Sequence, residues 1–419
     1  GDPKTMKLVQ LSRDFAKERS ITHFHDANET ILHTKFYRDL VQPGDVVLGA
    51  DSHTSSHGGM GAFAIGLGGA DVAAELDAKR AIAQGTRVAM VLGESWIEVP
   101  EAISVEYEGA LPFGVGGKDV ILRTLGLLKR NTVAMERSVE YRGSAARTFS
   151  TDMRFTIANM TAEFGGLNGI FEPDGTVAAW LAGRASHNDT TAWYRADDDA
   201  PYLQRHRIDL DRLAPQVAKY YSPDNVRDVT AFAGHELQGL FIGACTTTEE
   251  ELVLGALVLE QAFKERAPVD PQRTRLVVPG DRNIEQRLRD RGLWKHYENA
   301  GFRIGPPGCS MCLGVASERA QPGEHWLSSQ NRNFHNRMGE GSLAWLASGA
   351  TVAASAVDMR ITDPRPLLTR VDQERFAALL DRKDLRIPEV RHAEPVVETT
   401  NAPASSDGTT TASGKAASV

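Results

Sequence analysis

The chain of 419 residues contains three cysteines, and their placement constrains it more than any other feature. Two of them, Cys309 and Cys312, form a CxxC pair, and the third, Cys245, ends an apolar run that begins at Gly239. Three thiolates can bind three irons of a cubane iron–sulfur cluster and leave the fourth iron open as a Lewis acid, whereas an electron carrier normally uses four cysteines. The pattern therefore favours a catalytic cluster over an electron-transfer cluster.

Cysteine spacing alone leaves other interpretations open. A CxxC pair also occurs in redox sites and in zinc knuckles. A thioredoxin-like pair would open a helix directly after a strand, whereas this pair follows a turn at residues 305–308. Zinc would need a fourth ligand, which His296 or His325 could supply. The cysteines could also bind no metal.

Composition narrows the class of protein. The length predicts two to three domains, and the hydrophobic (41%) and charged (24%) fractions are typical of soluble globular proteins. The formal net charge of −8 disfavours a nucleic-acid surface, and no apolar run is long enough to predict a transmembrane helix. Because three cysteines cannot all pair, we expect a reducing, cytoplasmic location and no secreted disulfide framework.

The first part of the chain has the pattern of a parallel sheet. Residues 45–50 predict a buried strand that runs into the polar segment 51–53, and a glycine-rich stretch follows. Residues 71–83 have helical spacing, and residues 87–93 predict another strand. Strand, loop, helix and strand form a βαβ rhythm, and such sheets place their chemistry in loops at the carboxyl ends of the strands.

A second α/β pattern begins near residue 226. Residues 239–245 and 274–279 predict strands, and residues 248–251 have a capping-box pattern that opens a helix to about residue 266. Cys245 is therefore expected between a strand end and a helix N-terminus. Amide groups and the helix dipole at that position favour a negatively charged cluster.

Two further segments carry candidate site residues. Asp51, Ser52 and His53 at a strand end could position water or bind a carboxylate, or they could form a helix cap with a hydrogen-bonded histidine. Arg332 and Arg337 place two guanidinium groups near each other, which suits a dicarboxylic acid because arginine binds carboxylates bidentately. The alternative for the arginines is a solvated polar loop.

A helix predicted over residues 155–164 places Asn159 and Glu163 on one face, four residues apart. The Gly165-Gly166 pair would end this helix. A carboxylate there could transfer protons or hold water. The alternative is an ordinary surface pair.

Six segments, taken in their order along the chain, resemble the aconitase family. The Cys-Ser-Met-Cys form of the CxxC segment is most similar to the large subunit of 3-isopropylmalate dehydratase, and the resemblance runs from about residue 31 to residue 357. The segments are residues 49–54, the glycine-rich stretch after them, and residues 157–160, 245–246, 308–314 and 331–334.

The resemblance implies a [4Fe-4S] cluster and a site around it. The implied cluster ligands are Cys245, Cys309 and Cys312. The residues implied to lie beside the cluster or its bound water are Asn159, Glu163 and Asn331. The residues implied to lie in the active site, or in its proton-transfer network, are Asp51, Ser52, His53 and His33. The arginines implied to bind substrate carboxylates are Arg332 and Arg337.

The fold that follows is α/β, with three-layer α/β/α domains around a cleft that holds the cluster. We expect a first domain over residues 1–98, a second over 99–225, a cluster-binding domain over 226–388 and a disordered tail over 389–419. From Thr399 onward the tail has no aromatic residue, no Leu or Ile, and one valine. The family's swivelling last domain, which carries a serine base and another substrate arginine, is not found and is expected as a separate small subunit.

Two departures from the family pattern stand out. The usual Ser-Cys-Thr-Asn around the first cysteine is replaced by residues 244–247, Ala-Cys-Thr-Thr. The family's early Asp-His pair is also not found, so the first domain is expected to be incomplete at its N-terminus. His23, His25 and Asp26 lie nearby in the sequence but do not match that pair.

The activity implied is that of a hydro-lyase and isomerase that dehydrates and rehydrates a hydroxy di- or tricarboxylic acid, such as a 2-substituted malate like 2-isopropylmalate. The expected partners are this small-molecule substrate and the small subunit. Two alternatives stay open: a degenerate, non-catalytic scaffold, and a family member that binds RNA when its cluster is lost. The acidic balance of charge disfavours RNA.

Overall fold

The computed structural model describes residues 3–66, 99–184, 193–264, 267–270, 272–314, 318–383, 386–388, 390 and 392. The helix expected at residues 71–83, the strand expected at 87–93 and the tail from residue 399 lie outside these described residues. Parallel strands and helices alternate through the described chain, so the expected α/β class with parallel sheets is confirmed.

The larger sheet has seven strands in the order β11-β10-β9-β12-β13-β7-β8. Its five strands from β11 to β13 are parallel, while β7 and β8 are antiparallel. The strands are β7 Gln216–Ala218, β8 Val226–Asp228, β9 Gly239–Ile242, β10 Thr274–Val277, β11 Arg303–Ile304, β12 His325–Ser328 and β13 Leu343–Leu346. Since β7 precedes residue 225 and joins the sheet of later residues, the division into domains stays a prediction.

Side-chain alternation along β9 builds a different core on each face of this sheet. Leu240 and Ile242 pack into a large cluster with the helices, whereas Phe241 faces a second cluster that includes Cys312. The helices that follow β9 along the chain are α9 Glu249–Ala262, α10 Arg282–Asp290, α11 Trp294–Asn299, α12 Gly349–Ser355, α13 Arg365–Leu368 and α14 Gln373–Leu379. The segment that carries the CxxC pair therefore lies against the sheet face opposite the main helical core.

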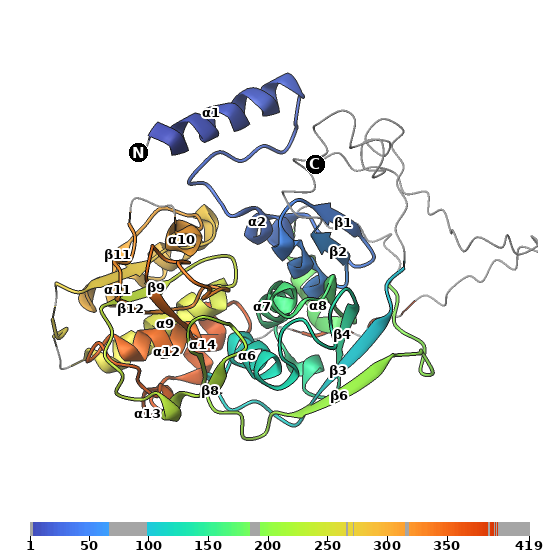
Figure 1. The fold of residues 1–419 in the computed structure, drawn as a ribbon. Coiled ribbons are helices and arrows are strands. Elements are labelled where there is room, and N and C mark those ends of the chain that lie inside the picture. Colours follow the sequence, from blue (N-terminus) through green and yellow to red (C-terminus); the bar gives the residue numbers. More distant parts are fainter. Residues whose placement is uncertain are drawn as a thin grey trace, which may run out of the picture.

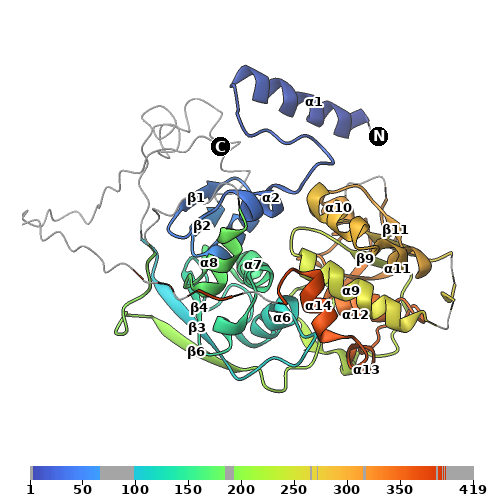
Figure 2. The ribbon, with the colours of Figure 1, turned by 180° about the vertical axis from the view of Figure 1, so that it is seen from behind.

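The smaller sheet has four parallel strands in the order β5-β4-β3-β6. Its strands are β3 Ala102–Glu108, β4 Ser138–Arg142, β5 Asn168–Phe171 and β6 Gln204–Asp209. The helices of this region are α6 Gly117–Leu128, α7 Thr151–Asn159 and α8 Gly175–Ala182, and short 3-10 helices are η2 Ala146–Thr148, η3 Met160–Phe164 and η4 Val229–Ala231. In both views α6 lies between the two sheets (Figures 1 and 2).

The N-terminal region contains α1 Pro3–Glu18, α2 Leu32–Asp39, β1 Val46–Gly49, the 3-10 helix η1 Ser52–Met60 and β2 Phe63–Gly66. Helix α1 stands away from the rest of the described chain (Figure 1). The strand expected at residues 45–50 is present, but the prediction that it is buried is wrong. Val46 and Leu48 are 69% and 53% exposed, because β1 pairs only with β2 among the described residues.

Two other sequence predictions need correction. The helix expected over residues 155–164 is α-helical only to Asn159 and continues as the 3-10 helix η3, so Glu163 is not on a regular α-helical face with Asn159. Helix α9 begins after Thr248 as expected, but the Thr248 side chain makes no cap hydrogen bond. Both carboxylate oxygens of Glu251 also lack a hydrogen-bond partner among the described residues, so the predicted capping box does not form.

Glycines allow η1 to lie directly on its neighbours, and this contact fixes the polar segment at its start. A Cβ atom at Gly59 would lie 2.7 Å from the backbone nitrogen of Phe155 in α7, and one at Gly58 would overlap the carbonyl oxygen of Gly169 in β5. Real Cβ atoms do not approach backbone so closely, so a side chain at either position would push η1 outward.

We expect Gly59→Ala to lower the free energy of unfolding by about 1–3 kcal/mol, because an added methyl group overpacks a backbone contact that cannot yield. Chemical denaturation of the two proteins measures the difference. Gly183→Ala is the matched control, since its added Cβ would meet only the Trp180 carbonyl oxygen at 3.6 Å. Equal stability of the two variants would show that η1 is not tightly held.

Candidate active site

Three segments that are far apart in the sequence meet around one carboxylate. Oxygen Oε1 of Glu163, in η3, accepts a hydrogen bond from Arg332 Nε at 2.7 Å and one from His53 Nε2 at 3.1 Å. The same arginine donates from Nη2 to Ser52 Oγ at 2.6 Å. The structure thus brings together a buried acid, a histidine and an arginine from η1, η3 and the loop after β12.

Asp51 anchors the other end of this network. Its Oδ1 caps η1 by accepting from the His53 backbone nitrogen at 2.7 Å, and it also accepts from His53 Nδ1 at 3.0 Å and His33 Nε2 at 3.2 Å. These hydrogen bonds, His33's first, hold the pKa of Asp51 well below its usual range. Asp51 therefore caps η1, which was the alternative interpretation of this segment, and it also contacts both histidines of the candidate site.

The charges of this network reinforce one another. Burial alone would lower the pKa of His53, but its hydrogen bonds to Asp51 and Glu163 outweigh burial and raise it. Burial alone would raise the pKa of Glu163, but the hydrogen bond from His53 and the charge of Arg332 lower it. Glu163 is buried, so the surface-pair alternative does not describe it.

Sequence reasoning missed His57, a third histidine next to the network. Its Nε2 lies 3.4 Å from His33 Nδ1, and its ring packs edge-on against Phe36. Burial, with a smaller contribution from His33, lowers the pKa of His57 well below its usual value, which favours the neutral ring. The available signal was a second histidine within the same short polar stretch as His53.

The sulfur of Cys245 accepts two amide hydrogen bonds, from Asn159 Nδ2 at 3.2 Å and Asn331 Nδ2 at 3.1 Å. The two asparagines are also joined, because Asn331 Nδ2 donates to Asn159 Oδ1 at 3.0 Å. Cys312 Sγ lies 3.4 Å from Asn331 Oδ1 and 3.7 Å from Arg337 Nη2. The predicted asparagines and Arg337 thus contact the predicted cluster ligands.

The pKa values of Cys245 and Cys309 are raised in part by the neighbouring cysteines. Burial raises the pKa of Cys245 to about 12, with a further contribution from Cys312, and burial raises the pKa of Cys309 with contributions from both others. Within the described ranges, no group of three or more Cys, His, Asp or Glu residues could hold a single metal ion. A zinc site needs such a group, whereas in a cubane cluster each cysteine binds a different iron.

Neither histidine considered as a zinc ligand lies at this site. His325 begins β12, whose parallel neighbour β9 runs away from it toward Cys245. His325 lies instead beside His235, with Nδ1 3.0 Å from the Nε2 of that ring. His296, on α11, is 3.7 Å from Glu260 Oε1.

Thr247 occupies the position where the family usually has asparagine. Its hydroxyl donates to the Gly243 carbonyl at 2.5 Å and lies 2.7 Å from Ser329 Oγ. It therefore ties the Cys245 loop to the end of β12. The amide donors that reach Cys245 come from Asn159 and Asn331 instead.

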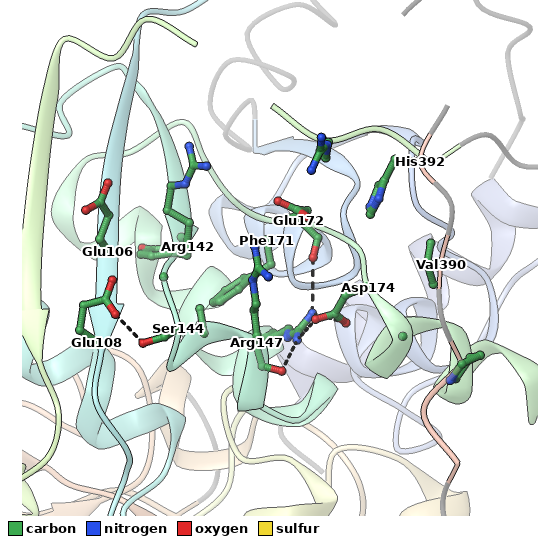
Figure 3. Close-up of a pocket in the computed structure, with 17 residues that line it drawn as sticks. Glu106, Glu108, Arg142, Ser144, Arg147, Phe171, Glu172, Asp174, Val390 and His392 are labelled. Carbon is green, nitrogen blue, oxygen red and sulfur yellow. Dashed lines mark hydrogen bonds and ion pairs between the residues drawn. The ribbon is translucent and has the colours of Figure 1, made fainter. Parts of the chain in front are cut away.

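A cavity of about 820 Å³ lies elsewhere, at the carboxyl ends of β3, β4 and β5 (Figure 3). Charged side chains of both signs line it, including Glu108, Arg147 and Glu172, and His392 from the C-terminal segment closes one side. None of the site residues predicted from the sequence lines this cavity. The hydrogen-bonded network, and not the size of a cavity, therefore defines the candidate site.

Comparison with known proteins assigns the sequence to a family. The model of the aconitase family (aconitate hydratase) matches residues 4–238 and 230–358. The chain therefore belongs to the aconitase family, and the resemblance drawn from its sequence is confirmed. No helix in the described ranges has the length and apolar character needed to span a membrane.

Individual relatives carry two kinds of name. The chain is 44% identical over 381 residues to 3-isopropylmalate dehydratase large subunit gloJ of Glarea lozoyensis, and 44% identical over 382 residues to aconitase htyD of Aspergillus rugulosus. These matches cover 90% and 91% of the chain but only 42% of each relative, so the chain spans about two-fifths of their length. It is 37% identical over 362 residues to 3-isopropylmalate dehydratase large subunit 1 of Methanopyrus kandleri, which covers 86% of the chain and 81% of that relative.

We expect Glu163→Gln to lower the pKa of His53, because the neutral amide removes the carboxylate that favours the imidazolium. NMR titration of the His53 ring proton in the metal-free protein measures this change. The exposed Glu298 on α11 supplies the control Glu298→Gln, which should leave the His53 titration in place. An unchanged His53 pKa in Glu163→Gln would refute the coupling.

The same coupling predicts the pH dependence of stability. Since the folded-state pKa of His53 is raised, its stabilising contribution is complete below pH about 6.5, the unfolded value, and is lost as the pH rises through the folded value. The loss of thermal stability over that window should be smaller in Glu163→Gln than in the unchanged protein.

Proposed function

We propose that the chain is the large-subunit part of an aconitase-type hydro-lyase and isomerase. It would dehydrate and rehydrate a hydroxy di- or tricarboxylic acid, and a 2-substituted malate such as 2-isopropylmalate is the proposed substrate. One observation supports the proposal: the Asp51–His53–Glu163–Arg332 network adjoins the sulfur of Cys245. Asn159 Nδ2 donates both to Ser56 in η1 and to Cys245, and Asn331, which precedes Arg332, donates to the same sulfur. Family membership and the names of the relatives support the same activity.

Cys245, Cys309 and Cys312 would hold a [4Fe-4S] cluster. When bound, such a cluster supplies a Lewis-acidic iron that makes the substrate hydroxyl a better leaving group. The amides of Asn159 and Asn331 would orient the Cys245 sulfur and stabilise its thiolate by hydrogen bonding.

His53 and Glu163 would handle the proton that accompanies water. Their Nε2–Oε1 hydrogen bond of 3.1 Å holds a proton between a histidine of raised pKa and a buried carboxylate. Asp51 orients the opposite nitrogen of the ring, so His53 can present that proton in only one direction. Such a pair would act in general acid–base catalysis when a substrate proton comes within hydrogen-bonding reach of it.

Two arginines would bind the carboxylates of the substrate. Arg332 is fixed by Glu163 and Ser52, so its planar head is oriented before a substrate arrives. Arg337 lies 3.7 Å from Cys312 Sγ, and its Nε is buried without a partner among the described residues. We propose that this guanidinium group binds a second carboxylate of the substrate.

The base that removes the carbon-bound proton would come from a small, swivel-domain subunit. That partner, a cytoplasmic location and the lack of nucleic-acid binding remain predictions. The scaffold and RNA-binding alternatives are not favoured, because the acid, histidine and arginine of the network are all present and paired with one another.

Arg332→Lys tests this function directly. The lysine keeps the charge but loses the planar fork, so kcat/KM for 2-isopropylmalate should fall by about 30- to 1000-fold, equivalent to about 2–4 kcal/mol of transition-state binding. The measurement is steady-state kinetics of the chain assembled with a swivel-domain subunit. Iron content should not change.

Arg365→Lys is the matched control, because Arg365 is an exposed arginine paired with Asp363 outside the site. It should retain full activity. If Arg332→Lys were equally active, Arg332 would be an ordinary loop residue. If the unchanged assembly were inactive on every hydroxy-dicarboxylate offered, the proposed activity itself would be wrong.

A further inference from the structure

Lys118 is a completely buried lysine in the first turn of α6, and the proposed reaction does not use it. Its ammonium group has three neutral partners: the Gln330 carbonyl oxygen at 2.8 Å, Thr246 Oγ1 at 3.2 Å and Met160 Sδ at 3.4 Å. An ammonium group has three protons to donate, so these contacts use its full capacity. Burying a charged lysine with no carboxylate in contact costs free energy. We therefore ask what function the buried ammonium group serves.

Each of these partners stands next to one member of the asparagine–cysteine triad formed by Cys245, Asn159 and Asn331. Thr246 follows Cys245, Met160 follows Asn159, and Gln330 precedes Asn331. One ammonium group therefore ties together the three chain segments whose side chains meet at the Cys245 sulfur.

The acidic groups around Lys118 are Glu251 in α9 and, on the side of the site, Cys245, Cys312 and Glu163. Burial lowers the pKa of Lys118, and the acidic groups that oppose this are Glu251 first, then Cys245, Cys312 and Glu163. Glu251 is itself buried and both of its carboxylate oxygens lack a partner among the described residues. A cavity of about 20 Å³ borders Glu251, which is room for one water molecule. Asp119, the next residue along α6, accepts backbone hydrogen bonds from Gly116 and Gln216.

We propose that Lys118 is a positioning residue of the cluster site. Its ammonium group would fix the backbone that carries Cys245, Asn159 and Asn331, and would place one positive charge behind the thiolates that bind the cluster. This inference rests on the proposed cluster. Outer contacts of this kind change metal affinity, and nearby charge changes the reduction potential of an iron–sulfur cluster.

The test compares four variants with the unchanged chain after anaerobic reconstitution with iron and sulfide. Lys118→Met removes the charge at similar length, and Lys118→Met/Glu251→Gln also removes the buried carboxylate that would otherwise lose its counter-charge. Lys129→Met is the control, because Lys129 lies at the other end of α6 and donates a solvent-exposed hydrogen bond to the Asp224 carbonyl. Glu251→Gln alone is the fourth variant, and with the other two changes it completes a double-mutant cycle of Lys118 and Glu251.

Three quantities are measured: the rate of iron loss to a chelator, the midpoint potential of the cluster, and the thermal midpoint of the metal-free protein. We expect Lys118→Met to lose iron about 10- to 100-fold faster and to have a more negative potential than the unchanged chain. The double variant should recover thermal stability but keep the fast iron loss and the lowered potential. Lys129→Met should match the unchanged chain in all three.

The outcomes separate this inference from the proposed function. If the unchanged chain binds no iron, the proposed cluster fails and the role of Lys118 fails with it. If the unchanged chain binds iron but the double variant matches its iron loss and potential, only the inference is wrong. A double variant that cannot fold would also contradict it, because Lys118 would then serve the core and not the site.

Discussion

The Glu163 carboxylate is buried, and one of its oxygens accepts hydrogen bonds from both Arg332 and His53. A buried carboxylate is tolerable only when charge and hydrogen bonds compensate its lost hydration. The two donors come from the loop after β12 and from η1. The need of the Glu163 carboxylate for both hydrogen bonds therefore holds these two segments and η3 in fixed positions relative to one another. Asp51 then fixes the other side of His53, and this orders the whole network.

The fold meets this requirement through close backbone contact. The glycines of η1 let it lie on α7 and β5, which brings His53 within hydrogen-bonding distance of the helix end that carries Glu163. Helix α6 lies between the two sheets. The side chain of Lys118, in the first turn of α6, contacts Met160, Thr246 and Gln330, which come from three different segments around the site. Cys245 and Cys312 thus lie where segments far apart in the sequence meet, as expected for a site at the carboxyl ends of parallel strands.

Local signals in the sequence predicted part of this arrangement. The place of Cys245 between β9 and α9 followed from an apolar run and a helix start, both of which are short-range patterns. The burial of Glu163 could not be predicted, because helical spacing shows which residues share a face but not how deeply that face is buried. The exposure of β1 could not be predicted either, because it depends on which strands pair with β1. Lys118 was missed because its partners lie up to 212 residues away in the sequence, and no local pattern encodes such contacts.

The central proposal is that Cys245, Cys309 and Cys312 would hold a [4Fe-4S] cluster close to the Glu163–Arg332 pair. Mössbauer spectroscopy of the chain reconstituted with ⁵⁷Fe tests this most directly. The account predicts about four irons per chain, with one iron distinct from the other three and altered when 2-isopropylmalate is added. Cys309→Ser should abolish this spectrum. Four equivalent irons whose spectrum does not change when 2-isopropylmalate is added would contradict the account. A colourless protein with one tightly bound zinc would also contradict it.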